Sequence, residues 1–168
     1  DIVILSGKPK QAPPVVQRKA QTPVKVIQSQ DALRFNSSMD LDSIQFRVGQ
    51  LFVLDRIFFH TGRHVVVDES LPEMERLYKV MDENPTLAIN IEGHVCCVHP
   101  SVDALDLDTG ELKLSINRAK FIYDYLVKKG IEQDRLSYEG FGKTKPLRIN
   151  EFIQEDQDMN KRVEIRVL

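Results

Sequence analysis

Residues 84–94 read NPTLAINIEGH, and this stretch decides the fold class. The Asn-Pro pair at its start predicts the end of a helix, because a residue that precedes proline is disfavoured in helical backbone. Leu87, Ile89 and Ile91 then alternate with small or polar residues, which is typical of a β-strand with one buried face. The stretch therefore predicts a helix that ends and a buried strand that begins directly after it.

Patterns of the same kind lie on both sides of this strand. Upstream, residues 52–59 are apolar and predict a strand, and Ser70 with Glu73 forms a possible capping box for the helix that follows. Downstream, Ser115 can cap a second helix, and Gly130 is suited to end that helix in the left-handed conformation. The strand thus lies between two amphipathic helices.

Two further strands are predicted at residues 136–141 and 163–167, where apolar and polar residues alternate. The order strand, helix, strand, helix, strand, strand predicts an α/β fold: a two-layer domain with a mixed β-sheet and the helices packed on one face. We assign this domain to residues 49–168. Residues 1–48 contain half of the eight prolines and predict an N-terminal extension or linker, with possible short strands at residues 24–27, 33–35 and 44–48.

Composition excludes several classes of protein. A hydrophobic fraction of 42% in 168 residues is enough to form a core. The net charge of −2 gives no indication of the strongly basic face that nucleic-acid-binding proteins carry. The apolar stretches are far shorter than the roughly 20 residues that cross a bilayer, so we expect no membrane span in this chain. Because the chain starts at Asp1, we expect it to be a mature or excised part of a longer protein.

Several short motifs follow one another in a fixed order along the chain. They are NP at 84–85, INIEGH at 89–94, LSINRA at 114–119, YLVKKGI at 125–131, RL at 135–136, GFG at 140–142 with Pro146, and NKRVEI at 160–165. Together they resemble the OmpA-like peptidoglycan-binding domain found at the C-termini of Gram-negative outer-membrane proteins and lipoproteins. The resemblance covers residues 49–168, and residues 1–48 carry no such likeness.

The resemblance implies a periplasmic module, part of an outer-membrane protein or lipoprotein, that anchors the outer membrane to the cell wall. Its ligand would be the diaminopimelate residue of the peptidoglycan stem peptide, whose side chain ends in one ammonium and one carboxylate. A site for that group needs both an anion and a cation, and an arginine can bind the carboxylate with two hydrogen bonds. Arg118 matches the arginine that has this role in the family.

The ammonium side of the expected site departs from the family pattern. Cys96 stands at the position of the aspartate that binds the ammonium, and a neutral thiol cannot replace a carboxylate. The connection from Cys96 to Arg118 is longer than usual and acidic, so we expect one of its acids to supply the missing carboxylate. These acids are Asp103, Asp106, Asp108 and Glu111, and the better candidates are Asp108 and Glu111, which are closer in sequence to the helix of Arg118. Glu111 itself stands where the family has an asparagine.

The last motif of the resemblance supplies three more candidate ligand-binding residues. Asn160 and Arg162 match the family, whereas Lys161 replaces an arginine and so keeps the charge but loses the planar fork. Arg162 has an alternative role as an ion-pair residue at the start of the final strand.

The sequence also contains residues with the chemistry of metal ligands. The acidic residues between Asp103 and Glu111, with Thr109-Gly110, have the chemistry of a calcium loop but not the spacing of an EF-hand. The hexapeptide HVCCVH at 94–99 offers four zinc ligands that point to both faces of a strand and cannot all converge on one ion. A site of two of these ligands with a neighbouring aspartate is the alternative. His60 and His64 flank a glycine in a loop, and we expect both to be surface residues.

No nucleophile, base and orienting residue occur in a recognisable arrangement, so we expect a protein that is not an enzyme and has no cofactor, with calcium as the alternative. The second functional hypothesis is an OmpA-like scaffold or protein-interaction domain, metal-dependent or not, in which the peptidoglycan site is altered or lost. The change at Cys96 favours that hypothesis, and the retained Arg118 favours peptidoglycan binding.

Overall fold

The computed structural model describes residues 33–35, 45–99 and 102–168, and the strand predicted at residues 24–27 lies outside them. The elements in chain order are β1 (Leu33–Phe35), β2 (Leu51–Leu54), η3 (Asp68–Ser70), α1 (Leu71–Glu83), β3 (Ile89–Gly93), α2 (Leu114–Lys129), η4 (Gln133–Arg135), β4 (Leu136–Gly140), α3 (Gln154–Asn160) and β5 (Val163–Val167). The elements η3 and η4 are single turns of 3-10 helix. None of the helices in these ranges is long and apolar enough to cross a membrane.

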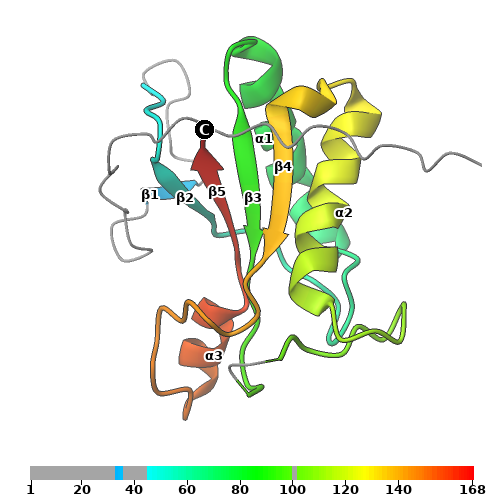
Figure 1. Cartoon of the computed structure of the whole chain (residues 1–168), viewed down its shortest axis with the longest axis vertical. Helices are drawn as coiled ribbons and strands as arrows, with labels where there is room; N and C mark the ends of the chain where they lie inside the picture. Colours follow the sequence, from blue (N-terminus) through cyan, green and yellow to red (C-terminus); the bar gives the residue numbers. More distant parts are fainter. Residues whose placement is uncertain (1–32, 36–44, 100–101) are drawn as a thin grey trace, which may run out of the picture.

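The strands form one mixed sheet in the order β1-β2-β5-β3-β4 (Figure 1). β5 is antiparallel to its neighbours β2 and β3, whereas β1 pairs parallel with β2 and β3 pairs parallel with β4. The chain passes through α1 between β2 and β3, and through α2 between β3 and β4. The mixed sheet predicted from the sequence is therefore confirmed.

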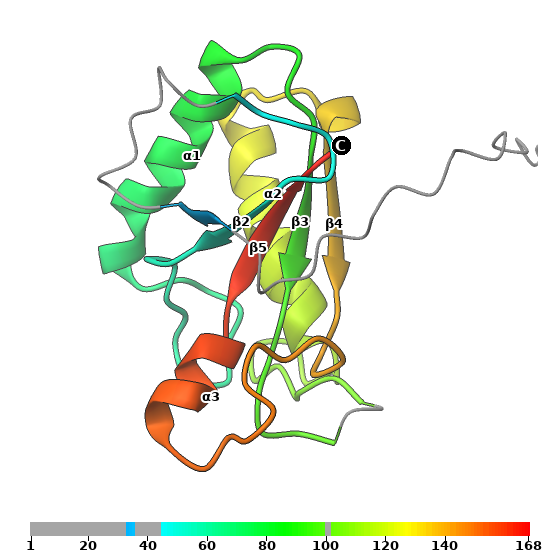
Figure 2. The same cartoon turned by 90° about the vertical axis from the view of Figure 1, so that its left-hand side faces the viewer.

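The helices α1 and α2 cover one face of this sheet and form the core with it (Figures 1 and 2). The core residues from α1 and α2 are Met74, Leu77, Val80, Met81, Ala119, Ile122 and Leu126, and those from the strands include Phe52, Leu54, Ile89, Ile91, Val163, Ile165 and Val167. Burial of each large apolar side chain contributes roughly 1.5–3 kcal/mol. The predicted placement of both helices on one face is confirmed.

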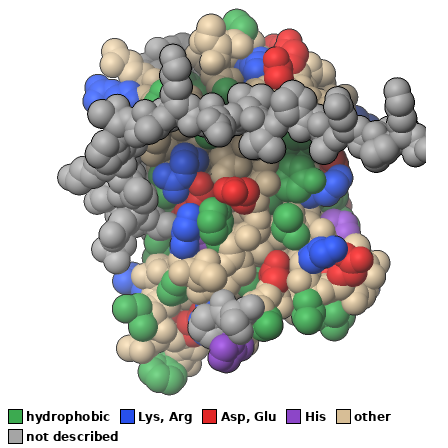
Figure 3. All heavy atoms as spheres, viewed as in Figure 1, with side chains coloured by type: hydrophobic (Ala, Val, Ile, Leu, Met, Phe, Trp, Pro, Cys, Tyr) green, Lys and Arg blue, Asp and Glu red, His purple; other side chains and the backbone are tan. Residues whose placement is uncertain are grey.

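The opposite face of the sheet is polar over β3, β4 and β5, where charged residues alternate with the core residues. Figure 3 shows acidic and basic side chains gathered over the strands of this face. Arg166 donates from Nε to Glu92 Oε1 at 2.5 Å. Arg162 donates from Nε to the fully buried Glu164 at 2.7 Å, and His94 Nε2 lies 3.3 Å from the other oxygen of Glu164. These pairs neutralise charges that the sheet buries.

The sequence predicted the helices themselves more accurately than the residues that cap them. Ser70 precedes α1, but its hydroxyl binds the backbone of Phe58 instead of capping the helix. Ser115 lies inside the first turn of α2, and the side chain of Asp103 accepts its backbone N–H at 3.0 Å. Both predicted caps are therefore wrong, because each serine binds a partner far along the chain.

The predicted ends of strands and helices are confirmed in some places and wrong in others. The strand predicted at residues 52–59 ends at Leu54, and Phe59 instead bridges to Val66. Residues 45–48 form no strand, but the strand predicted at residues 33–35 exists as β1. Gly130 ends α2 with φ +108°, which confirms the predicted left-handed C-terminal glycine.

Candidate ligand-binding site

A cavity of about 1030 Å³ opens at the end of the sheet where α3 lies, and we call it the Arg118 cavity. It lies between the loop after β2, the loop after β3, the start of α2, and the segment before β5 that contains α3. Its lining residues from these parts are Val53, Leu54, Asp55, Ile57, Phe58, Phe59, Thr61, Gly62, Val95, Cys96, Cys97, Ala104, Leu114, Arg118, Leu147, Arg148, Gln154, Asp158, Met159, Lys161 and Arg162.

Two glycines place the start of α2 against the sheet and so bring Arg118 to the cavity. A Cβ at Gly93 would lie 2.0 Å from the carbonyl oxygen of Ser115, and a Cβ at Gly140 would lie 2.5 Å from the backbone nitrogen of Ile116. No larger residue permits this approach. The hydroxyl of Ser115 also accepts the backbone N–H of Gly142 at 3.0 Å, which fixes the first turn of the helix on the end of β4.

The guanidinium of Arg118 is held in place by neutral groups. Its Nε donates to the carbonyl oxygen of Arg63 at 3.1 Å, and its carbon Cζ lies 4.7 Å from the centre of the Phe59 ring. Only 6% of the residue is exposed. Within the described part of the chain, no carboxylate forms an ion pair with it.

Electrostatics make this arginine receptive to an anion. Burial lowers the pKa of Arg118 to about 10, although the nearby charges of Asp106 and Asp103 oppose that shift. The side chain therefore remains charged at neutral pH but lacks most of its hydration. For a cation that is desolvated in this way, binding of a carboxylate to its free N–H donors is energetically favourable.

Three other residues predicted for the site also line the cavity. The sulfur of Cys96 is bonded to that of Cys97, so it is neither a thiol nor a thiolate. Arg162 is buried and bound to Glu164 and to the carbonyl oxygen of Lys145, which supports its alternative role as an ion-pair residue. Lys161 Nζ lies 3.2 Å from Asp158, so it contributes charge to the rim.

The remaining predicted residues do not line the cavity. Asn160 is fully buried, and its amide accepts the backbone N–H groups of Leu147 and Arg148 and donates to the carbonyl oxygen of Arg148. It thereby shapes the wall of the cavity from behind. Asp108 is 2.7 Å from Arg63, and Glu111 is 2.9 Å from Lys113. The structure does not bring these two acids to Arg118.

Sequence reasoning missed the two carboxylates that do line the cavity, Asp55 and Asp158. Asp158 lies three residues before Lys161, just ahead of the last motif at residues 160–165. Asp55 follows β2 directly and lies in a turn. The sequence predicted that the strand continues through this position, so neither the turn nor the place of Asp55 on the cavity was predicted. Phe59, whose ring lies under the guanidinium of Arg118, was missed because it was predicted to belong to the same strand.

The acidic residues after Cys97 are held by different partners. Asp103 binds Ser115 at the start of α2, whereas Asp106 is fully buried and accepts from Asn117. Burial would raise the pKa of Asp106, but the hydrogen bonds to its carboxylate outweigh burial and lower it. Of the four acids in this loop, the structure places only Asp106 and Asp108 together.

Known proteins resemble this chain in sequence and in fold. Residues 58–160, more than half of the chain, match the OmpA family. The chain belongs to the OmpA family. The resemblance found in the sequence motifs, and the fold that it implied, are thereby confirmed.

Two relatives of this OmpA-family chain differ in how much of it they match. The outer membrane protein Omp38 of Acinetobacter baumannii is 28% identical over 166 residues, which cover 96% of this chain but 39% of Omp38. The chain thus spans about two fifths of that relative, and the match also reaches into residues 1–48. A peptidoglycan-associated lipoprotein of Rhizobium meliloti is 30% identical over 95 residues, covering 56% of this chain and 50% of the lipoprotein.

Solved structures show the same fold. The cell wall anchor of the T6SS from Pseudomonas aeruginosa aligns with a TM-score of 0.56 at 25% identity, over 66% of this chain and 74% of the anchor. The periplasmic domain of Helicobacter pylori MotB aligns with a TM-score of 0.55 at 21% identity, over 70% of this chain and 73% of that domain. The second likeness concerns the fold alone.

Proposed function

We propose that this OmpA-family domain binds peptidoglycan without catalysis, and that it anchors an outer-membrane protein or lipoprotein to the cell wall from the periplasm. The observation that carries the proposal is Arg118, a buried cation on the wall of a cavity, with which no carboxylate among the described residues forms an ion pair. The named cell-wall anchor and the peptidoglycan-associated lipoprotein among its relatives support the same function.

The ligand group would be the end of a diaminopimelate side chain. Its carboxylate binds Arg118, and its ammonium binds a carboxylate on the same cavity, for which Asp55 and Asp158 are the lining candidates. Asp158 is already bound to Lys161 and Gln154, so an incoming ammonium would share or replace these partners. The disulfide at Cys96 provides no charge for either end of the ligand.

The test is co-sedimentation of the full chain with purified diaminopimelate-type sacculi, with free diaminopimelate as competitor. We expect Arg118→Ala to weaken binding roughly 10- to 100-fold, the loss of about 1.5–3 kcal/mol that a charged hydrogen bond contributes. Arg118→Lys should retain part of the affinity. Lys120→Ala is the matched control, because Lys120 lies on the same helix, is exposed and pairs with Asp124.

Sacculi with lysine in place of diaminopimelate distinguish binding through Arg118 from non-specific electrostatic attraction between the protein and the cell wall. Lysine keeps the ammonium but lacks the second carboxylate, so these sacculi should bind weakly and respond little to Arg118→Ala. Equal binding of both types of sacculus, or full binding by Arg118→Ala, would reject the proposal.

The same assay identifies the ammonium partner. Asp55→Asn and Asp158→Asn test the carboxylates on the cavity, and Glu111→Gln with Asp108→Asn tests the prediction from the sequence. The geometry favours the first pair, so we expect a loss of about tenfold in one of those two variants and little change in the others.

A second function, a scaffold that binds protein, is favoured by one specific observation. Ile149, Phe152 and Ile153, which precede or begin α3, are 87%, 89% and 56% exposed. Such a group of apolar side chains on a surface is typical of an interaction site. This function becomes the better one if the wild-type chain does not bind sacculi at all.

A further inference from the structure

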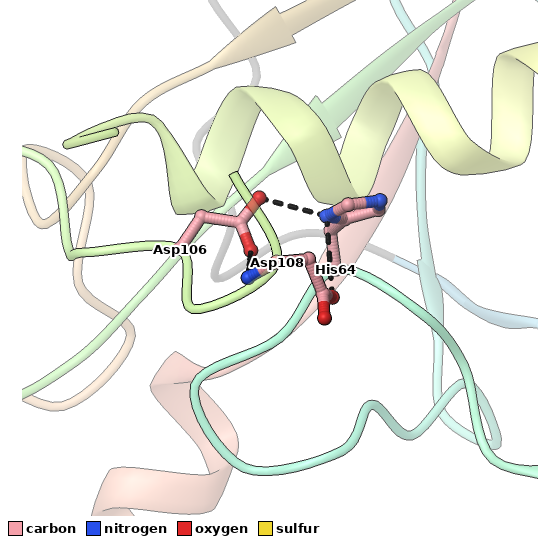
Figure 4. A group of neighbouring side chains, drawn as sticks. All are labelled: His64, Asp106 and Asp108. Carbon is pink, nitrogen blue, oxygen red and sulfur yellow. Dashed lines mark hydrogen bonds and ion pairs between the residues drawn. The ribbon is translucent and has the colours of Figure 1, made fainter. Parts of the chain in front are cut away.

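Three side chains from two separate loops meet beside the start of α2 (Figure 4). His64 lies in the loop between β2 and η3, and Asp106 and Asp108 lie in the loop between β3 and α2. The Nδ1 atom of His64 is 2.7 Å from Asp106 Oδ2 and 3.5 Å from Asp108 Oδ2. One ligand atom from each residue lies within 4.8 Å of the others.

An imidazole with two carboxylates is a ligand set for zinc or a similar transition metal, not for calcium. Zinc binds nitrogen and oxygen at about 2.0–2.2 Å, so tetrahedral ligand atoms lie about 3.3–3.5 Å apart. The distance from His64 to Asp108 already has this value, and the distance to Asp106 would lengthen by about 0.6 Å. Calcium needs six to eight oxygens, whereas Asp103 and Glu111 are bound elsewhere.

Other groups already orient the two carboxylates. Asp106 is fully buried, and its carboxylate accepts hydrogen bonds from Asn117 at 2.7 Å and from the backbone N–H of Asp108 at 3.0 Å. The second oxygen of Asp108 accepts from Arg63 at 2.7 Å. In known metal sites, hydrogen-bond partners of this kind orient the side chains that bind the metal directly.

The cluster is also open to solvent. The side chains of His64 and Asp108 are 24% and 18% exposed, whereas that of Asp106 is closed off. An ion can therefore enter from one side, bind a carboxylate that is fixed beneath it, and keep water at its remaining position. An open fourth position is usual where a protein supplies three ligands.

We propose that His64, Asp106 and Asp108 form a binding site for one divalent transition-metal ion, with Zn²⁺ as its probe. The ion replaces the hydrogen bond between His64 Nδ1 and Asp106, and it binds the imidazole as the neutral tautomer whose proton is on Nε2. It would tie together the two loops that flank the start of α2. His64 follows Arg63, whose carbonyl oxygen holds Arg118, so the ion would also stiffen the support of that arginine.

The experiment uses the full chain, freed of metal with a chelator and kept without reductant. Titration calorimetry and thermal unfolding are measured with Zn²⁺ and with Ca²⁺. We expect one equivalent of Zn²⁺ to bind and to raise the melting temperature, and Ca²⁺ at the same concentration to do neither. Asp108→Asn and His64→Gln should each weaken Zn²⁺ binding at least tenfold.

The chain supplies matched controls. His60 and His99 are exposed and lie outside the cluster, so His60→Gln and His99→Gln should bind Zn²⁺ like the wild type, as should Glu111→Gln in the same acidic loop. The absorption bands of bound Co²⁺ provide a second measurement, which should show tetrahedral coordination in the wild type and vanish in Asp108→Asn.

Two results would overturn the proposal: Zn²⁺ binding that survives both Asp108→Asn and His64→Gln, or binding that His60→Gln or His99→Gln removes. Should His64→Gln fail to fold, Asp108→Asn alone decides, because Asp108 lies on the surface of the loop. Peptidoglycan is absent from these measurements, so their outcome is independent of the proposed function.

Discussion

At position 96 the chain has a disulfide sulfur where the family has the aspartate that binds the ammonium. Cys96 lines the Arg118 cavity and is only 6% exposed. We predict that Cys96→Asp combined with Cys97→Ser strengthens binding to diaminopimelate-type sacculi about tenfold, because a charged hydrogen bond contributes about 1.5–3 kcal/mol. Cys96→Ser with Cys97→Ser is the control, since it removes the disulfide but adds no charge. Equal affinity of the two double variants would contradict this prediction.

Glu164 gives the stability of the fold a dependence on pH. Burial would raise its pKa, but His94 and Arg162 outweigh burial and lower the pKa from 4.5 to about 2. Because the folded pKa lies below the unfolded one, this carboxylate stabilises the fold above about pH 4.5, and the contribution is lost as the pH falls toward 2. The shift corresponds to about 3 kcal/mol.

The measurement is urea unfolding of the wild type and of Glu164→Gln between pH 7 and pH 3. The variant should be less stable at pH 7, since it leaves Arg162 buried without its charged partner. Its free energy of unfolding should then change less than that of the wild type between pH 5 and pH 3. Parallel curves in this range would show that Glu164 does not carry the dependence. Burial lowers the pKa of His94 below its ordinary value, so the neutral imidazole also stabilises the fold, and this contribution declines as the pH falls below about 6.5 in the wild type and in the variant alike.

Asn160 determines the shape of the cavity wall through a single amide. Its removal in Asn160→Ala leaves the partly buried N–H groups of Leu147 and Arg148 without their side-chain acceptor, at a cost of about 0.5–1.5 kcal/mol for each lost hydrogen bond. We predict a lower melting temperature and weaker binding to sacculi. Lys161→Ala, at the next residue, should lower the melting temperature far less, because its ion pair with Asp158 is largely exposed.

At the scale of elements, the placement of α2 decides whether Arg118 reaches the cavity. Gly93→Ala puts a Cβ 2.0 Å from a backbone carbonyl of that helix, so the helix must move away from β3. We predict a loss of stability of about 1–3 kcal/mol and a larger loss of sacculus binding than stability alone explains. Gly110→Asn is the control, since its Cβ meets nothing within 4 Å and asparagine tolerates its φ of +75°. Normal binding by Gly93→Ala would separate the helix position from the site.

The sequence predicted those elements whose pattern is local. β3, β5 and the end of α2 at Gly130 follow from alternation and from one glycine, and the structure has all three. The errors concern residues whose partners are distant: Ser70 binds Phe58, and Ser115 binds Asp103. No local pattern carries that information, because tertiary contacts choose among the hydrogen bonds that a serine can make.

The same distinction applies to the candidate site. Arg118 could be predicted because a family motif surrounds it, whereas Asp55 comes to the cavity only through the turn after β2. His64 and Asp106 are separated by 42 positions and meet only because two loops lie at the same end of the sheet. His64 was accordingly predicted to be a surface residue without a partner role.

At the scale of the whole molecule, all core and cavity residues that the structure describes lie after position 45. Phe46 packs on the core, and the cavity is lined by residues between Val53 and Arg162. The earlier part contributes β1, a three-residue edge strand that pairs with β2. We therefore predict that a chain shortened to residues 45–168 folds and binds sacculi with the affinity of the full chain.

The shortened chain should nevertheless melt at a lower temperature, because β2 loses its neighbour and exposes an unpaired edge. Circular dichroism and sedimentation velocity would measure the melting temperature and any association through that edge, and co-sedimentation would measure binding. Loss of sacculus binding by a chain that still folds would place part of the site before residue 45. In that case the division into an extension and a binding domain at residue 49 would be wrong, and the match to Omp38, which reaches into residues 1–48, would mark a functional segment.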